Sequence, residues 1–168
     1  MAHNPIEEQI LAQFTFGPRF TGEGVLFRFW SPKRESVTLV LDGKDTGQMK
    51  PVGDGWFERL EPNAKAGTRY AFRLPDGLTV PDPASRHQPE DVHGPSELVD
   101  PEAYMWQTRD WKGHAAEELV LYELHVGAFT PEGTFRAAIG KLDHLKSVGV
   151  TAVQLMPIAD FPGRYGWL

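Results

Sequence analysis

Carboxylates and histidines are the residues of this sequence most able to do chemistry, but few are placed to do it. Glu123 lies in the middle of an apolar segment, and the sequence places no second carboxylate beside it to complete an acid–base pair. The six histidines lack the helical i, i+4 spacing that would put two metal ligands on one face. We therefore predict no catalytic residue, no metal site and no cofactor in these 168 residues.

Tryptophan offers another kind of chemistry, because a broad indole face can stack on the apolar face of a sugar ring. Trp30 and Trp56 each lie in a segment that alternates apolar and polar residues. One face of such a strand must be core. We expect at least one of the two tryptophans to be a core residue, and a ligand platform remains open for the other.

Composition limits the classes of protein that fit. With 40% hydrophobic and 24% charged residues, the chain falls within the range of soluble globular proteins. Its net charge of −6 argues against nucleic acid or an anionic membrane as a partner, so a neutral ligand is expected. The absence of cysteine, of a signal-peptide pattern and of a membrane-spanning segment predicts a cytoplasmic protein.

The first part of the chain is predicted to be all-β. Apolar and polar residues alternate in four short segments, several of which end in turn signals such as Asp42-Gly43 and Asp76-Gly77. These segments are residues 24–30, 36–42, 56–60 and 68–74. The pattern predicts an immunoglobulin-like β-sandwich over residues 1–95.

Five prolines between residues 81 and 101 mark a segment that cannot be a continuous helix or a central strand. One interpretation is a plain linker. A flexible linker is usually small and polar, however, whereas this segment also holds Arg86 and His93. We expect a fixed structure in which these two side chains donate hydrogen bonds, followed by a connector over residues 96–117.

Residues 118–168 are predicted to contain a β-α-β unit. Residues 119–129 form an apolar run typical of a strand buried on both faces, with Glu123 and His125 on one side by alternation. Apolar residues at intervals of three and four predict one helix over 134–148, and residues 150–156 predict a second strand. One such unit cannot cover its own sheet, so we expect it to continue into a larger sheet or barrel and the chain to be truncated.

Three sequence motifs resemble a known family. The run YELHVGAFT at residues 122–130 resembles the first barrel strand of the α-amylase superfamily, and GVTAVQLMP at 149–157 resembles the second. The segment DPASR at 82–86, continuing through QP at 88–89 and VHGPS at 92–96, is similar to the maltooligosyltrehalose trehalohydrolases of glycoside hydrolase family 13. The sandwich resembles the glycogen-binding-module-like domain that precedes the barrel in such enzymes.

This resemblance implies an N-terminal sandwich followed by the first β-α-β unit of a (β/α)8 barrel. It also implies hydrolysis of the α-1,4 bond that joins trehalose to a maltooligosaccharide, with α-glucan or maltooligosyltrehalose as ligand. The family's catalytic carboxylates lie on the fourth, fifth and seventh barrel strands, which these 168 residues do not include. We therefore expect this chain to be inactive alone.

The resemblance also implies roles for individual residues. Glu123 and His125 become a polar pair in the barrel interior, and Arg86 and His93 pin the segment between sandwich and barrel. Asp160, Tyr165 and Trp167 lie on the loop after the second strand, which reaches the substrate side of a barrel. The family usually continues from this tryptophan through Gly-Tyr-Asp, whereas here Leu168 follows.

Two alternatives remain open. The chain could be a non-catalytic carbohydrate-binding or interaction module that acts through its sandwich. It could also be a fragment of an isoamylase-like debranching enzyme or of a branching enzyme, although the motifs at residues 82–96 argue against this interpretation.

Overall fold

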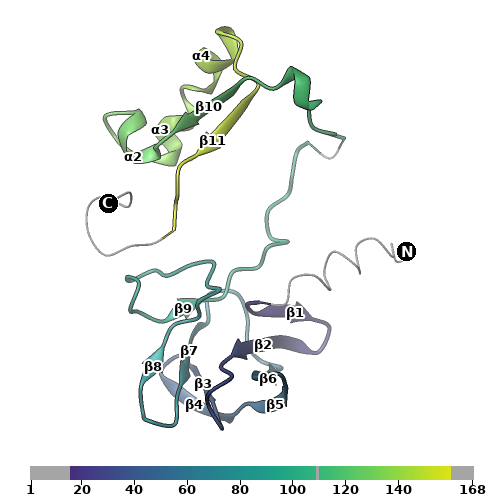
Figure 1. Ribbon diagram of the computed structural model, residues 1–168, viewed down its shortest axis with the longest axis vertical. Helices are drawn as coiled ribbons and strands as arrows, with labels where there is room; N and C mark the ends of the chain where they lie inside the picture. The colour runs from purple at the N-terminus through teal and green to yellow at the C-terminus, as the bar shows by residue number, and fades with distance from the viewer. Residues whose placement is uncertain (1–15, 109, 160–168) are drawn as a thin grey trace. The chain divides into compact units, whose positions relative to one another are not determined.

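A computed structural model describes residues 16–108 and 110–159 of the chain (Figure 1). The chain divides into two compact units, the first ending at Tyr104 and the second beginning at Met105. Within the described ranges, no helix is long and apolar enough to span a membrane.

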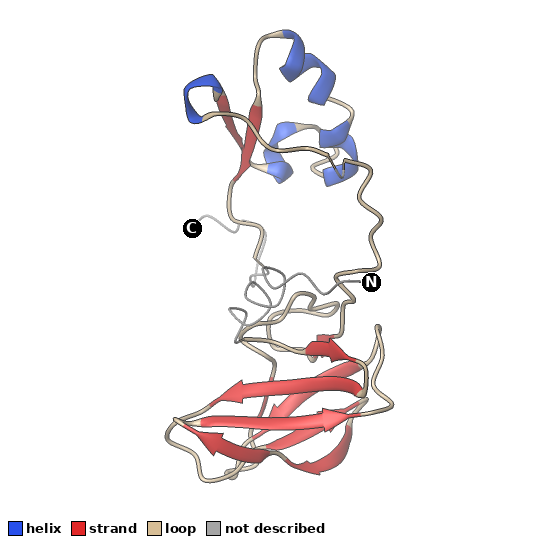
Figure 2. Ribbon diagram, turned by 90° about the vertical axis from the view of Figure 1, so that its right-hand side faces the viewer, coloured by secondary structure: helices blue, strands red, loops and turns tan. Residues whose placement is uncertain are grey.

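The first unit is a sandwich of two antiparallel sheets (Figures 1 and 2). One sheet has the order β1 (Arg19–Thr21), β2 (Gly24–Trp30), β6 (Trp56–Glu61) and β5 (Lys50–Gly53). The other has the order β4 (Lys44–Gln48), β3 (Thr38–Leu41), β7 (Arg69–Arg73) and β8 (Thr79–Val80), with β9 (Ser96–Glu97) also paired to β7. The predicted sandwich and its four predicted strands are confirmed.

The core of the sandwich follows from strand alternation. On β2, Val25, Phe27 and Phe29 are buried. Rings from the two sheets meet between them: Phe29 stacks on Phe72 at a centroid distance of 4.3 Å, and Phe27 contacts Tyr70 edge-on at 5.3 Å. Aromatic pairs at such distances add about 0.5–1.5 kcal/mol each beyond the area they bury.

Part of the segment after residue 95 also packs into the sandwich. Ser96 pairs with Tyr70 in the β7–β9 ladder, and Leu98 is 3% exposed in the core. The backbone N–H of Leu98 donates to the carbonyl of Thr68, and its carbonyl accepts from Gly67. Ser96 and Leu98, which lie in the predicted connector, are therefore structural members of the sandwich.

The second unit contains a short parallel strand pair with small helices. Its elements are a 3₁₀ turn at Ala116–Glu118, β10 (Leu121–Leu124), α2 (Val126–Phe129), α3 (Phe135–Ile139), α4 (Leu142–Ser147) and β11 (Ala152–Leu155). Strands β10 and β11 pair in parallel, as the predicted β-α-β order requires. Gly149 follows α4 with a φ of 92°, so its predicted role as a helix stop is confirmed.

Two predicted elements of this unit are wrong in extent. The apolar run at 119–129 is not one strand, because the backbone turns into α2 after His125. The predicted helix at 134–148 is two helices, since regular α-helical hydrogen bonding breaks at Gly140 and Lys141 donates to the carbonyl of Ala138. Glycine costs about 1 kcal/mol relative to alanine inside a helix, which favours a break there.

The apolar faces of the second unit are largely exposed, as expected for one β-α-β unit. Among its described residues, the buried apolar side chains are Leu124, Ala138 and Leu145. Many larger apolar residues are at least 40% exposed: Leu119, Val120, Leu121, Tyr122, Phe135, Ile139, Leu142, Val148 and Leu155. Two strands and three short helices therefore do not form a closed core.

Candidate functional site

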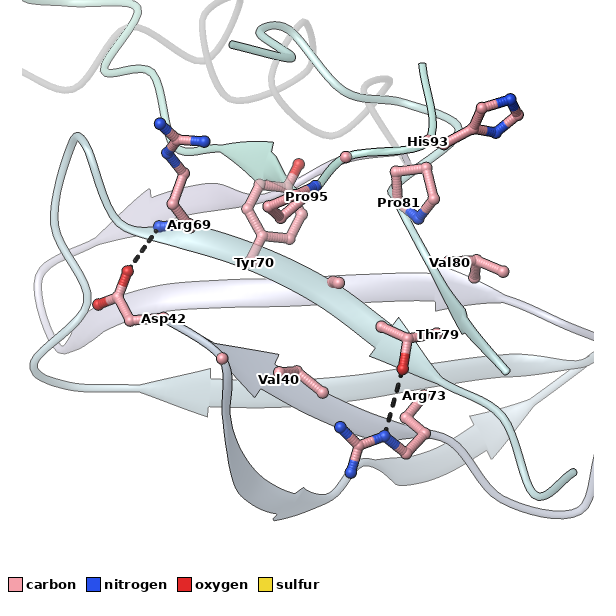
Figure 3. Close-up of a pocket in the computed structure, with 13 residues that line it drawn as sticks. Val40, Asp42, Arg69, Tyr70, Arg73, Thr79, Val80, Pro81, His93 and Pro95 are labelled. Carbon is pink, nitrogen blue, oxygen red and sulfur yellow. Dashed lines mark hydrogen bonds between the residues drawn. The ribbon is translucent and has the colours of Figure 1, made fainter. Parts of the chain in front are cut away.

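A pocket of about 590 Å³ lies on the outer face of the sheet that contains β3, β7 and β8 (Figure 3). Its volume falls within the range of small-molecule sites. The apolar part of the lining is Val40, Tyr70, Ala71, Val80, Pro81 and Pro95, and the polar part is Asp42, Arg69, Arg73, Thr79 and His93. An apolar floor with a polar rim is therefore open to a ligand from one side of the sandwich.

Alternation along β7 creates this hollow. Tyr70 and Phe72 point into the core, so Arg69, Ala71 and Arg73 lie on the opposite face of the strand. The small Ala71 side chain between two long arginines leaves room above the sheet. Figure 3 shows Arg69 and Arg73 at the two ends of this stretch, with Thr79 beside Arg73.

The positive charges at the pocket are compensated by neighbouring carboxylates. Arg73 contacts Asp45 at 2.7 Å and donates from Nε to Thr79 Oγ1 at 3.2 Å. Arg69 contacts Glu90 at 3.2 Å and Glu97 at 3.0 Å. Each of the two guanidinium groups at the pocket is therefore paired with a carboxylate in the folded chain.

A buried polar network supports the pocket from behind. Asp82 is 5% exposed and accepts hydrogen bonds from the Tyr70 hydroxyl at 3.0 Å and from the Ala84 backbone N–H at 2.8 Å. The Asp82 N–H donates to Ser96 Oγ at 3.0 Å. Burial raises the pKa of the Asp82 carboxyl, and burial together with the nearby Asp82 raises the pKa of Tyr70. This network ties the proline-rich segment to β7.

Arg86 and His93, the two residues predicted to hold the proline-rich segment in place, both lie among the described residues. Arg86 donates from Nη1 to the carbonyl of Pro18 at 3.2 Å, within the first unit. His93 is one of the residues at the edge of the pocket, with its ring directed away from it (Figure 3), and its backbone N–H donates to Asp91 at 2.7 Å. Both residues are thus held against the sandwich, and their predicted contact with a barrel stays a prediction.

Glu123 lies in β10, and His125 follows this strand directly. Glu123 is exposed and accepts from Gln154 Nε2 at 3.3 Å, across the parallel β10–β11 pair. His125 lies one residue beyond β10, at the start of α2. Across the described ranges, no cluster of three potential metal-ligating side chains occurs. A barrel-interior role for Glu123 and His125 stays a prediction.

Asp160, Tyr165 and Trp167, the predicted substrate contacts, lie outside the described residues. Their placement at a sugar site stays a prediction.

The prediction that Trp30 or Trp56 is a core residue is wrong. The two residues are direct partners in the β2–β6 register, so both side chains project from the same face of the sheet. The adjacent pair, Phe29 and Phe57, fills the core instead. Trp30 is 53% exposed and Trp56 is half-buried.

The pocket residues Asp42, Arg69 and Arg73 were not predicted as site residues from the sequence. A signal for them was present: two arginines on one face of a predicted strand flank an alanine, and Asp42-Gly43 forms a turn near the same sheet edge. Their convergence depends on the pairing of β3 with β7, which a single sequence does not give.

Comparison with known families defines the class of the sandwich. Residues 15–83 match the family model of carbohydrate-binding module 48, the isoamylase N-terminal domain. A pullulanase structure from Paenibacillus barengoltzii shares the fold, with a TM-score of 0.71 and 24% sequence identity. The match covers 88% of this chain and 27% of the pullulanase chain. The first unit therefore has the fold of a carbohydrate-binding module.

Sequence relatives are more specific. The chain is 44% identical over 153 residues to the malto-oligosyltrehalose trehalohydrolase of Saccharolobus solfataricus. The aligned region covers 91% of this chain and 27% of that relative. The chain is 45% identical over 146 residues to the trehalohydrolase of Deinococcus radiodurans, covering 87% and 24%. The predicted resemblance to these trehalohydrolases is confirmed, and the chain spans about a quarter of their length.

A solved structure also agrees over most of the chain. A crystal structure from Salmonella typhimurium, whose protein carries a provisional α-amylase assignment, is 49% identical with a TM-score of 0.85. The match covers 91% of this chain and 26% of the Salmonella chain.

Proposed function

We propose that this chain is the N-terminal part of a glycoside hydrolase that releases trehalose from maltooligosyltrehalose by cleaving an α-1,4-glucosidic bond. The observation that carries this proposal is the 44% identity over 91% of the chain to a trehalohydrolase. In this proposal the second unit is the first β-α-β unit of a (β/α)8 barrel, and further barrel strands and helices cover the exposed faces of β10 and β11.

The sandwich contributes α-glucan binding in the pocket on β7 and β8. A neutral sugar ring has apolar C–H faces and a rim of hydroxyl groups, and the pocket matches both with an apolar floor and polar side chains at its edge. The paired charges of Arg69 and Arg73 add hydrogen-bonding capacity without selecting an anion. α-Glucan is therefore the ligand class that fits both the geometry and the relatives.

The two alternatives have less support. The branching enzyme of Chlamydia abortus is 28% identical over 162 residues, well below the trehalohydrolases. A mature non-catalytic module would have to keep the apolar faces of the second unit in water, and large exposed apolar patches favour aggregation or association.

Replacing Arg73 with alanine is expected to weaken maltoheptaose binding by the chain about tenfold. This is the effect of losing about 1.4 kcal/mol from a charge-assisted hydrogen bond to a sugar hydroxyl. Titration calorimetry or chemical-shift titration measures the affinity. The matched control is Arg34→Ala, since Arg34 also pairs with an aspartate, Asp76 at 3.0 Å, but does not line the pocket. Equal affinities for the Arg73 and Arg34 variants would contradict this site.

A further inference from the structure

The outer face of the other sheet carries an exposed aromatic surface. Trp30 on β2 is the direct partner of Trp56 on β6, and Arg28 is the partner of Glu58. The Phe16 ring lies 5.1 Å from that of Trp56 and extends the apolar area. We call these five residues the tryptophan face.

The tryptophan face is open to solvent and yet held in place. Trp30 is 53% exposed and Phe16 is 59% exposed. The Trp30 indole donates from Nε1 to the carbonyl of Asp54 at 3.0 Å, in the turn between β5 and β6. The backbone N–H of Ser31 donates to the Gly55 carbonyl in the same turn at 2.8 Å. An indole fixed in this way loses little conformational entropy when a ligand binds.

The charges on the tryptophan face neutralise each other. Arg28 donates from Nε to Glu58 at 2.6 Å, and its guanidinium lies 4.6 Å from the centroid of the Trp56 ring. This cation–π contact fixes the orientation of Trp56 from one side. The surface therefore combines rigid aromatic rings with a matched ion pair, a combination that favours a neutral ligand with apolar faces over an anion or a cation.

We propose that the tryptophan face is a second carbohydrate-binding surface, on which a pyranose ring of a neutral oligosaccharide stacks against the exposed Trp30 indole, next to Trp56. The whole face lies within the residues that match the carbohydrate-binding module. The choice of α-glucan as the oligosaccharide rests on the proposed function. The pocket lies on the outer face of the opposite sheet, so the two surfaces bind different segments of glucan or different chains.

Two surfaces on one module have a functional consequence. A long glucan, or neighbouring chains in a glucan particle, can engage both sides of the sandwich, and the second contact then forms at a raised effective concentration. Short oligosaccharides lack this gain. The tryptophan face thus gives the module a preference for polymeric or clustered glucan over single short chains.

The test is a titration of the ¹⁵N-labelled 168-residue chain with maltoheptaose, following the five tryptophan indole N–H resonances. We expect the Trp30 and Trp56 signals to shift in a saturable manner. The Trp111 signal should stay in place, since Trp111 is 69% exposed but lies outside the tryptophan face. Unmoved Trp30 and Trp56 signals at concentrations that shift the pocket amides of Ala71 and Thr79 would overturn the second surface and leave the proposed function intact.

Variants give an independent measurement. Trp30→Ala is expected to weaken binding at the tryptophan face about fivefold, the effect of losing one aromatic contact of about 1 kcal/mol. Trp30→Phe keeps a ring and should retain most of that affinity, and Trp111→Ala should bind as the parent chain does. Parent-like affinity of Trp30→Ala at this face would overturn the proposal. If maltoheptaose shifts no resonance at either surface of the parent chain, the proposed glucan binding by the sandwich is contradicted as well.

Discussion

Replacing Asp82 with alanine is expected to lower the free energy of unfolding of the sandwich by about 3 kcal/mol. The carboxyl is buried and accepts from the buried Tyr70 hydroxyl and the part-buried Ala84 N–H, so its removal leaves both donors without this partner, at a cost of about 1–3 kcal/mol for a buried donor and less for the other. It also frees the proline-rich segment from β7. Urea unfolding of the full chain, followed by circular dichroism, measures the change. A loss below about 1 kcal/mol would contradict the structural role of Asp82.

The Asp82→Asn variant is the matched control, because it keeps the shape of the side chain and removes its titration. Burial raises the pKa of Asp82 in the folded chain above the value of about 4 for an unfolded aspartate. The folded state therefore holds this proton more tightly. Its stabilising contribution is fully present below about pH 4 and is lost as the pH rises through the folded pKa. We expect the parent chain to lose stability relative to Asp82→Asn over this window, and a pH-independent difference would contradict this linkage.

Gly24→Ala is expected to destabilise the sandwich by about 3–5 kcal/mol, the larger of the two effects. Gly24 begins β2 with a φ of 136°, where side-chain-bearing residues are strained by about 1–3 kcal/mol. An added Cβ would also lie 2.5 Å from Pro62 Cα and 2.6 Å from the Glu61 carbonyl oxygen. These are backbone atoms of a paired strand and the turn after it, so relief requires movement of β6.

The control for this substitution is Gly43→Ala. Gly43 also has a positive φ, 76°, in the Asp42-Gly43 turn, but an added Cβ would meet nothing within 4 Å. We expect Gly43→Ala to cost about 1 kcal/mol, from backbone strain alone. Urea unfolding of both variants compares the two effects directly. Equal destabilisation by the two substitutions would contradict the prediction that the contact of the added Cβ with Pro62 and Glu61 makes Gly24→Ala the costlier change.

The sequence was sufficient to predict the sandwich strands because their alternation is strong and turn residues separate them. The segment 24–30 became β2 with unchanged bounds. Asp42 and Gly43 both have positive φ, as a tight hairpin turn between β3 and β4 requires. The short strands β1, β8 and β9 lacked such a pattern, because two or three residues are too few to show a period.

Pairing between distant strands limited the remaining predictions. The error over Trp30 and Trp56 arose because alternation gives two faces of a strand without saying which is core, and only the β2–β6 register places Phe29 and Phe57 inside. The pocket depends in the same way on β3 lying beside β7. In the second unit, the apolar periodicity continued through Gly140, where the backbone breaks the helix.

The most direct test of the proposed function is a chimera in which this chain replaces the aligned segment of the Saccharolobus solfataricus trehalohydrolase. The alignment of 153 residues at 44% identity defines the junction. The measurement is trehalose released from maltooligosyltrehalose, with residues 1–168 alone as the control. We predict that the chimera releases trehalose and that the isolated chain releases none. A chimera that folds cooperatively but releases no trehalose, or hydrolysis by the isolated chain, would contradict the account.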